Sequence, residues 1–88
     1  MSNSDTVILL VEDEENLHEA LKLNLELEGY QVVSAMDGKQ ALKALQGQYF
    51  DLMILDIMLP EMDGIEVLEN IRIQNNALPV LIDRKSVV

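Results

Sequence analysis

Cysteine is absent from this sequence of 88 residues, so disulfide bonds and thiolate metal sites are excluded. Long apolar runs are missing too, because no stretch approaches the roughly 18 apolar residues that suggest a membrane-spanning helix. The first residues also lack the basic and apolar regions of a secretory signal. Together these absences predict a chain that has no membrane segment and resides in the cytoplasm.

Basic residues are few, since six Lys and Arg stand against sixteen Asp and Glu, a formal net charge of −10. A charge of this sign repels phosphate backbones and anionic lipid headgroups. We therefore expect no direct binding of nucleic acid and no association with membranes. Most of the acids are expected to keep the surface solvated, with Glu12, Asp13 and Asp56 as exceptions.

Apolar segments of strand length alternate with segments of helical spacing. Residues 6–11 form a continuous apolar run, which is typical of a strand covered on both faces. In residues 14–28 the apolar side chains recur at helical spacing, and Gly29 is placed to end that helix. The alternation continues with predicted strands at 30–35, 50–55 and 80–82, a predicted helix that opens at Asp37 and Gly38, and another at about 64–73.

The resulting order, β-α-β-α-β-α-β, predicts an α/β fold with a parallel sheet and flanking helices. In such sheets ligands bind beyond the carboxyl ends of the strands. Glu12 and Asp13 follow the first predicted strand and Asp56 follows the third, so these three side chains should converge. Three carboxylates in one pocket repel one another unless a cation neutralises them. Oxygen ligands in a shallow site favour Mg²⁺.

Asp56 is the candidate nucleophile of this acidic group. A carboxylate beside Mg²⁺ can attack a phosphoryl group and become an acyl phosphate. Taken alone, an Asp after a strand is more typical of a turn or a helix cap. Its pairing with Glu12 and Asp13 favours the phosphoacceptor interpretation.

Two motifs carry a resemblance to a known family. Val-Glu-Asp-Glu at 11–14 and Leu-Asp-Ile-Met-Leu-Pro-Glu-Met-Asp-Gly at 55–64 together resemble the signature of the receiver domains of two-component response regulators. Residues 27–30 and 35–42 also match the sequence that is typical of that family, so the resemblance covers residues 1–82. It implies a flavodoxin-like parallel sheet in a signalling domain that is not an enzyme.

The resemblance also implies roles for individual residues. Asp56 would be phosphorylated by a sensor histidine kinase or a small phosphodonor. Asp13 would ligate Mg²⁺ directly, Glu12 largely through water, and the backbone carbonyl of Met58 would be the third protein ligand. His18 sits among polar neighbours in the sequence and has no second histidine to pair with, so we expect a solvated helix residue rather than a phosphorelay or metal site.

The sequence departs from the family's pattern after Ile82. Family receivers have five strands and five helices, with Thr or Ser ending the fourth strand and Lys ending the fifth. Here Arg84 stands where the hydroxyl residue is expected. We interpret residues 1–88 as a single receiver domain that lacks the fourth and fifth helices and the fifth strand. Without the Lys, one electrostatic clamp on the phosphoryl group is lost, which predicts impaired phosphorylation.

An open edge on the fourth strand predicts a homodimer or a larger assembly formed through that edge. This leaves an alternative function, a truncated or engineered receiver fragment that self-associates without signalling. A hydrolase that works through an aspartyl phosphate is disfavoured, because such enzymes carry a second Asp two positions after the first. Here that position is Met58.

Overall fold

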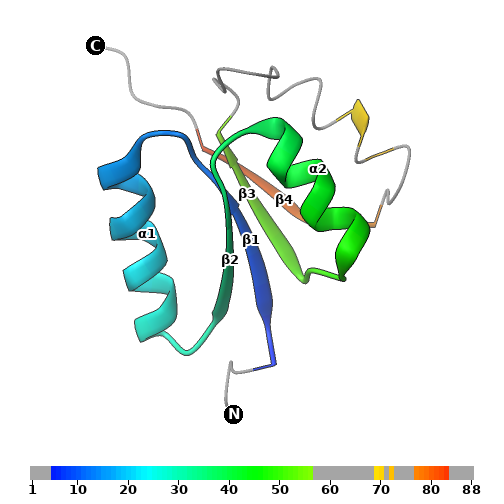
Figure 1. Ribbon diagram of the computed structural model, residues 1–88. Coiled ribbons are helices and arrows are strands. Elements are labelled where there is room, and N and C mark those ends of the chain that lie inside the picture. The colour runs from blue at the N-terminus through cyan, green and yellow to red at the C-terminus, as the bar shows by residue number, and fades with distance from the viewer. Residues whose placement is uncertain (1–4, 57–68, 71, 73–76, 84–88) are drawn as a thin grey trace.

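The computed structural model describes residues 5–56, 69–70, 72 and 77–83. Within these residues, four strands form one parallel sheet in the order β2-β1-β3-β4 (Figure 1). The elements in chain order are β1 (Val7–Val11), α1 (Glu15–Leu27), β2 (Gln31–Ala35), α2 (Gly38–Gly47), β3 (Leu52–Asp56) and β4 (Val80–Asp83). The predicted parallel sheet with flanking helices is confirmed. No helix in the described ranges has the length and apolar character needed to cross a membrane.

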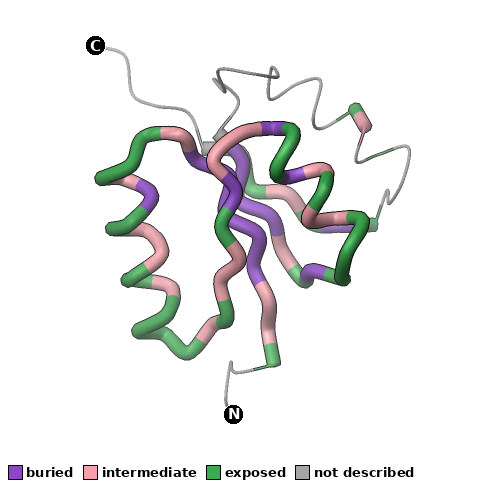
Figure 2. Tube along the Cα trace, in the orientation of Figure 1, coloured by how far each residue is buried: buried purple, intermediate pink, exposed green. Residues whose placement is uncertain are grey.

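β1 contributes to two apolar clusters, one on each face of the sheet. Figure 2 shows that most of this strand is buried. Ile8 and Leu10 pack on the face that α1 covers, whereas Leu9 and Val11 pack on the face that α2 covers. Successive side chains of a strand point to opposite faces. Burial on both faces therefore explains why the run is continuously apolar rather than alternating.

The C-terminus of α1 is closed by the glycine that the sequence placed there. Gly29 has a φ of 96°, a left-handed conformation that glycine adopts without steric penalty. Its N–H donates to the carbonyl of Glu26 at 2.9 Å, and the N–H of Tyr30 donates to the carbonyl of Leu25 at 3.2 Å. This pair of bonds is a Schellman motif, so the predicted stop of the first helix is confirmed.

The N-terminus of α2 is fixed by two reciprocal side-chain bonds. Asp37 is the N-cap, and its Oδ1 accepts from the N–H of Gln40 at 2.8 Å. The Oε1 of Gln40 reaches back and accepts from the N–H of Met36 at 2.9 Å. Both bonds satisfy backbone donors that helix geometry leaves without intrahelical partners. The helix consequently begins at Gly38, as the sequence predicts.

The predicted helix at residues 64–73 falls largely outside the described part of the chain. Three of its residues are described, and Glu69, Asn70 and Arg72 are all helical. The guanidinium of Arg72 donates to the carbonyl of Leu78 at 2.7 Å. This bond ties the helical segment to the residues that lead into β4.

Asp51 links the start of β3 to the start of β1 at the amino-terminal edge of the sheet. Its Oδ2 accepts from the N–H of Val7 at 2.8 Å, and its own N–H donates to the Val7 carbonyl at 2.8 Å. β3 therefore begins at Leu52 rather than at the predicted Phe50. The Phe50 side chain instead joins the apolar cluster beneath α2.

Replacing Asp51 with Ala tests this link. We expect the free energy of unfolding to fall by about 1 kcal/mol, because the variant leaves the Val7 N–H without its side-chain acceptor. Urea denaturation measures the change. Asp5→Ala, which removes the same charge from an exposed turn residue, is the matched control and should leave stability unchanged. Equal losses in both variants would contradict the role of the bond.

Candidate functional site

The carboxyl ends of the four strands meet at one edge of the sheet, at the top of Figure 1. Val11 of β1 pairs in register with Leu55 of β3. Glu12 and Asp56 are therefore the next residues on two neighbouring strands. On the other side of β3, Asp56 pairs in register with Asp83 of β4. The parallel register thus gathers acidic residues at the edge where α/β sheets bind ligands.

Glu12 is almost completely buried, with 1% of its surface exposed. Its N–H donates to the carbonyl of Ala35 at 3.1 Å, which extends the pairing of β1 with β2 by one residue. Its carboxylate accepts from the N–H of Glu14 through Oε2 at 2.7 Å. Burying a carboxylate is costly unless hydrogen bonds offset the lost hydration. The backbone of the following turn supplies one of those bonds.

The three consecutive acidic residues that follow β1, at positions 12–14, make different contacts. Glu14 is the N-cap of α1, and its carboxylate accepts from the N–H groups of Asn16 at 3.1 Å and Leu17 at 2.8 Å. Asp13 is half-buried between its two neighbours. Since Glu14 serves the helix, Glu12 and Asp13 are the residues of this turn that remain as candidate ligands.

Part of the predicted ligand set lies beyond the described residues. Asp56 is described as the last residue of β3, but its side chain and all of Met58 lie outside the description. Among the residues that are described, no group of three or more His, Cys, Asp or Glu could hold a metal ion. The set Glu12, Asp13, Asp56 and Met58 therefore stays a prediction. Its carboxylate and carbonyl oxygens fit Mg²⁺ better than a softer metal.

Both described helices begin at this same edge, because each follows a strand that ends there (Figure 1). Helix N-termini carry partial positive charge and favour nearby anions. The first turns of α1 and α2 are capped by Glu14 and Asp37. The edge therefore combines acids that suit a cation with helix ends that favour an anionic group.

The expectation that His18 is solvated is wrong. Its side chain is buried, with 2% of its surface exposed. The ring Nδ1 lies 2.8 Å from the carbonyl oxygen of Glu12, so this residue belongs to the surroundings of the site. Helical spacing could have revealed it, because His18, Leu21 and Leu25 recur at intervals of three and four, and both leucines pack toward the sheet.

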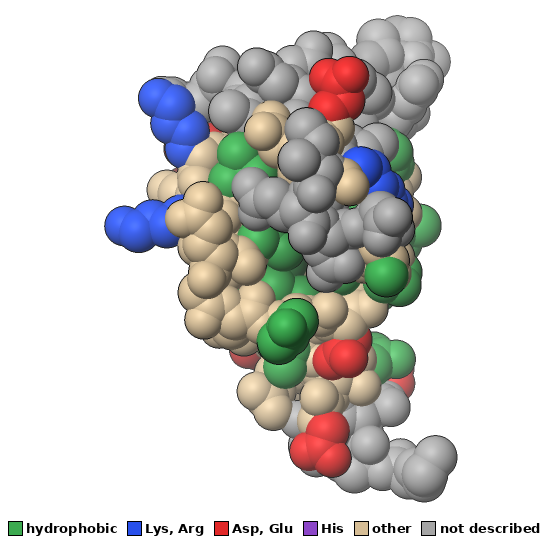
Figure 3. All heavy atoms as spheres, turned by 90° about the vertical axis from the view of Figure 1, so that its right-hand side faces the viewer, with side chains coloured by type: hydrophobic (Ala, Val, Ile, Leu, Met, Phe, Trp, Pro, Cys, Tyr) green, Lys and Arg blue, Asp and Glu red, His purple; other side chains and the backbone are tan. Residues whose placement is uncertain are grey.

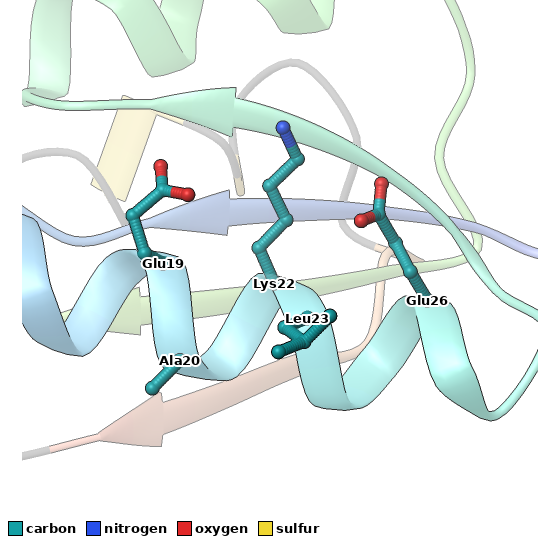
Figure 4. Close-up of a pocket in the computed structure, with 5 residues that line it drawn as sticks. All are labelled: Glu19, Ala20, Lys22, Leu23 and Glu26. Carbon is teal, nitrogen blue, oxygen red and sulfur yellow. The ribbon is translucent and has the colours of Figure 1, made fainter.

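A surface pocket on α1 lies away from the strand ends. Figure 4 shows its lining, in which every side chain comes from the middle or the last turns of the helix. Leu23 is 57% exposed there. The residues that line the pocket are Glu19, Ala20, Lys22, Leu23 and Glu26. Because none of them lies with Glu12 and Asp13 at the carboxyl ends of the strands, this pocket is separate from the candidate site.

Comparison with known sequences gives a consistent family match. A family model described as the response regulator receiver domain matches residues 8–83. The alkaline phosphatase synthesis transcriptional regulatory protein PhoP of Bacillus subtilis is 47% identical over 74 residues, which cover 84% of this chain and 31% of PhoP. The chain thus spans about a third of the length of this curated relative.

Solved structures agree with the sequence match. Response regulator TrrA from Thermotoga maritima, in complex with Mg²⁺-BeF, superposes with a TM-score of 0.86 at 38% identity, covering 90% of this chain and 69% of that one. A complex of the histidine kinase ThkA with TrrA matches with a TM-score of 0.82 at 39% identity, covering 88% and 66%. The flavodoxin-like fold expected from the sequence is therefore confirmed.

Replacing Glu14 with Ala tests whether this residue caps α1 without acting as a cation ligand. We expect the free energy of unfolding to fall by about 1 kcal/mol, because α1 loses its N-cap, while the affinity for a divalent cation is unchanged. Urea denaturation and calorimetric titration measure the two quantities. Glu15→Ala removes an exposed acid from the same turn and should alter neither. A loss of cation affinity in Glu14→Ala alone would contradict this assignment.

Proposed function

Because the chain belongs to the response regulator receiver domain family, we propose that it accepts a phosphoryl group on Asp56, with Mg²⁺ held by the neighbouring acids. Receiver domains are signalling domains of two-component systems rather than classical enzymes. The observation that carries the proposal is the register of β1 with β3, which makes Glu12 and Asp56 the next residues on adjacent strands. Asp13 follows on the same turn.

In the proposed reaction an oxygen of the Asp56 carboxylate forms a bond to phosphorus. The bond between phosphorus and the donor breaks at the same time, and the donor's leaving atom keeps the electron pair. The product is an acyl phosphate on Asp56. Bound Mg²⁺ would neutralise charge on the transferring oxygens. Asp13 would hold the ion directly and Glu12 largely through water, with Asp56 and the Met58 carbonyl as the other protein ligands.

The proposed donors are a sensor histidine kinase or a small phosphodonor. The kinase assignment is supported by the similar protein TrrA, which was solved in complex with the histidine kinase ThkA. We place the exchange in the cytoplasm. Nucleic acid and membranes are not proposed as direct partners, because a net charge of −10 repels both phosphate backbones and anionic lipids.

Phosphorylation is proposed to be weaker than in other family members. Arg84 stands at the family's Thr or Ser position, so the hydroxyl that family members place beside the phosphoryl group is not supplied there.

Incubation with Mg²⁺ and acetyl phosphate, followed by intact mass measurement, tests the acceptor. We expect a phosphoryl mass increment on part of the wild-type chain and none on Asp56→Asn, because the amide is not a nucleophile for phosphorus. Chelation of Mg²⁺ should abolish the increment, because the charge on the transferring oxygens is then no longer neutralised.

The matched control is Asp51→Asn, which changes an Asp at the opposite end of β3 and keeps an oxygen that can accept from Val7. This variant should gain the same increment as the wild type. A folded wild-type chain without any increment would overturn the proposed function. So would an increment that persists in Asp56→Asn.

A second candidate function is self-association without signalling, and the exposure of β4 favours it. Within the described residues, β4 pairs with β3 alone and forms an edge of the sheet. Leu81 is 56% exposed and Ile82 is 40% exposed. Figure 3 shows one side of the molecule on which apolar atoms reach the surface. An exposed edge strand with apolar side chains can pair with the same strand of a second copy across a two-fold axis.

Leu81→Lys tests this candidate by placing a charge at the edge. We expect the dimer dissociation constant to rise about tenfold or more, because an apolar contact is lost and two lysines approach across the axis. Analytical ultracentrifugation over a concentration series measures it. Leu27→Lys, at a position on α1 that is 75% exposed, should leave assembly unchanged. A wild-type chain that remains monomeric throughout would rule this candidate out.

A further inference from the structure

His18 is a buried residue to which the proposed reaction assigns no task. It lies on α1, with 2% of its surface exposed, and Glu12 is the other buried polar or charged residue among those described. His18 is the buried residue of α1, and Figure 2 shows that the rest of this helix is intermediate or exposed. A histidine is rarely buried without a specific hydrogen bond, so its contacts indicate its purpose.

The ring of His18 has a defined tautomer. Its Nδ1 lies 2.8 Å from the carbonyl oxygen of Glu12, and a carbonyl can only accept. Nδ1 must therefore carry the proton and donate it. The other ring nitrogen, Nε2, is buried with no hydrogen-bond partner among the described residues. The contact with Glu12 is thus the polar interaction that holds the ring.

His18 also binds the backbone on the C-terminal side of Asp13. The backbone N–H of His18 donates to the carbonyl of Glu14 at 2.8 Å. Asp13 is consequently the middle residue of a tripeptide whose first and last carbonyls are both bound by His18. The backbone bond is ordinary helix geometry, whereas the ring bond reaches the residue before Asp13 and depends on the histidine side chain.

We propose that His18 is a positioning residue, which fixes the backbone on both sides of Asp13 so that Asp13 and Glu12 are preorganised for a divalent cation. The inference rests on the proposed Mg²⁺ site and assigns it a supporting residue. A ligand that is held in place before binding loses less conformational freedom when the ion arrives. Outer residues that orient metal ligands contribute to affinity without touching the ion.

Two substitutions separate this role from simple packing. His18→Asn keeps an N–H donor the same number of bonds from the backbone as Nδ1. His18→Leu fills much of the space but leaves the Glu12 carbonyl without its donor. The matched control is Leu25→Ala, which removes packing from the same face of α1. Calorimetric titration gives the Mg²⁺ dissociation constant, and urea denaturation gives the stability of each variant.

We expect His18→Leu to raise the Mg²⁺ dissociation constant about tenfold, in line with the loss of an outer residue that orients a ligand. His18→Asn should restore most of the affinity. Leu25→Ala should lose stability yet bind Mg²⁺ as the wild type does. Unchanged affinity in His18→Leu would overturn the positioning role, and so would a loss of affinity in all three variants that follows their loss of stability.

The ring proton provides a readout that does not depend on the metal. Nitrogen-15 NMR of the wild-type imidazole should find a proton on Nδ1, and an Nδ1 without a proton would also overturn the proposal. The outcomes separate the two hypotheses. A wild-type chain that does not bind Mg²⁺ would refute the proposed function, whereas wild-type binding that His18→Leu leaves intact would refute the role of His18 alone.

Discussion

The parallel pairing of β1 with both of its neighbours is the constraint on which the rest of the molecule depends. β1 is buried on both faces, so its apolar side chains hold α1 against one face and α2 against the other. Because all strands run the same way, their carboxyl ends meet at one edge. The register of Val11 with Leu55 then determines that Glu12 and Asp56 are adjacent in the sheet. The burial that stabilises the fold therefore also assembles the site.

Carboxylates gathered at the carboxyl ends of the strands repel one another, and the same topology partly offsets this repulsion. Each β-α unit starts its helix where its strand ends, so the positive ends of α1 and α2 lie at this edge. The Glu14 N–H is bound by the Glu12 carboxylate, and the Glu12 carbonyl is bound by the His18 ring. The turn that presents the candidate ligands is therefore held by these two hydrogen bonds.

Much of this could be read from the sequence, because local signals and non-local contacts agree at most positions. Gly29 ends α1 as predicted, since the Schellman motif is a local device. The start of β3 was misplaced because Asp51 bonds to Val7, a contact across the sheet that no local pattern encodes. His18 was misjudged because its polar neighbours along the chain outweighed its helical spacing with Leu21. The ligand role of Met58 and the limits of the domain stay predictions.

The proposed ion site would link the stability of the chain to ion binding at this edge. A ligand that binds only the folded chain stabilises it by an amount that grows with the ratio of its concentration to its dissociation constant. The burial of Glu12 and the bonds that fix Asp13 act on the folded state alone, since an unfolded chain has neither. Bringing carboxylates together before the ion binds raises the free energy of the ion-free folded chain. The same arrangement strengthens ion binding, because the bound ion relieves the repulsion between the carboxylates. In the proposed site, the affinity would therefore depend on the whole sheet edge, with His18 as a positioning residue rather than a ligand.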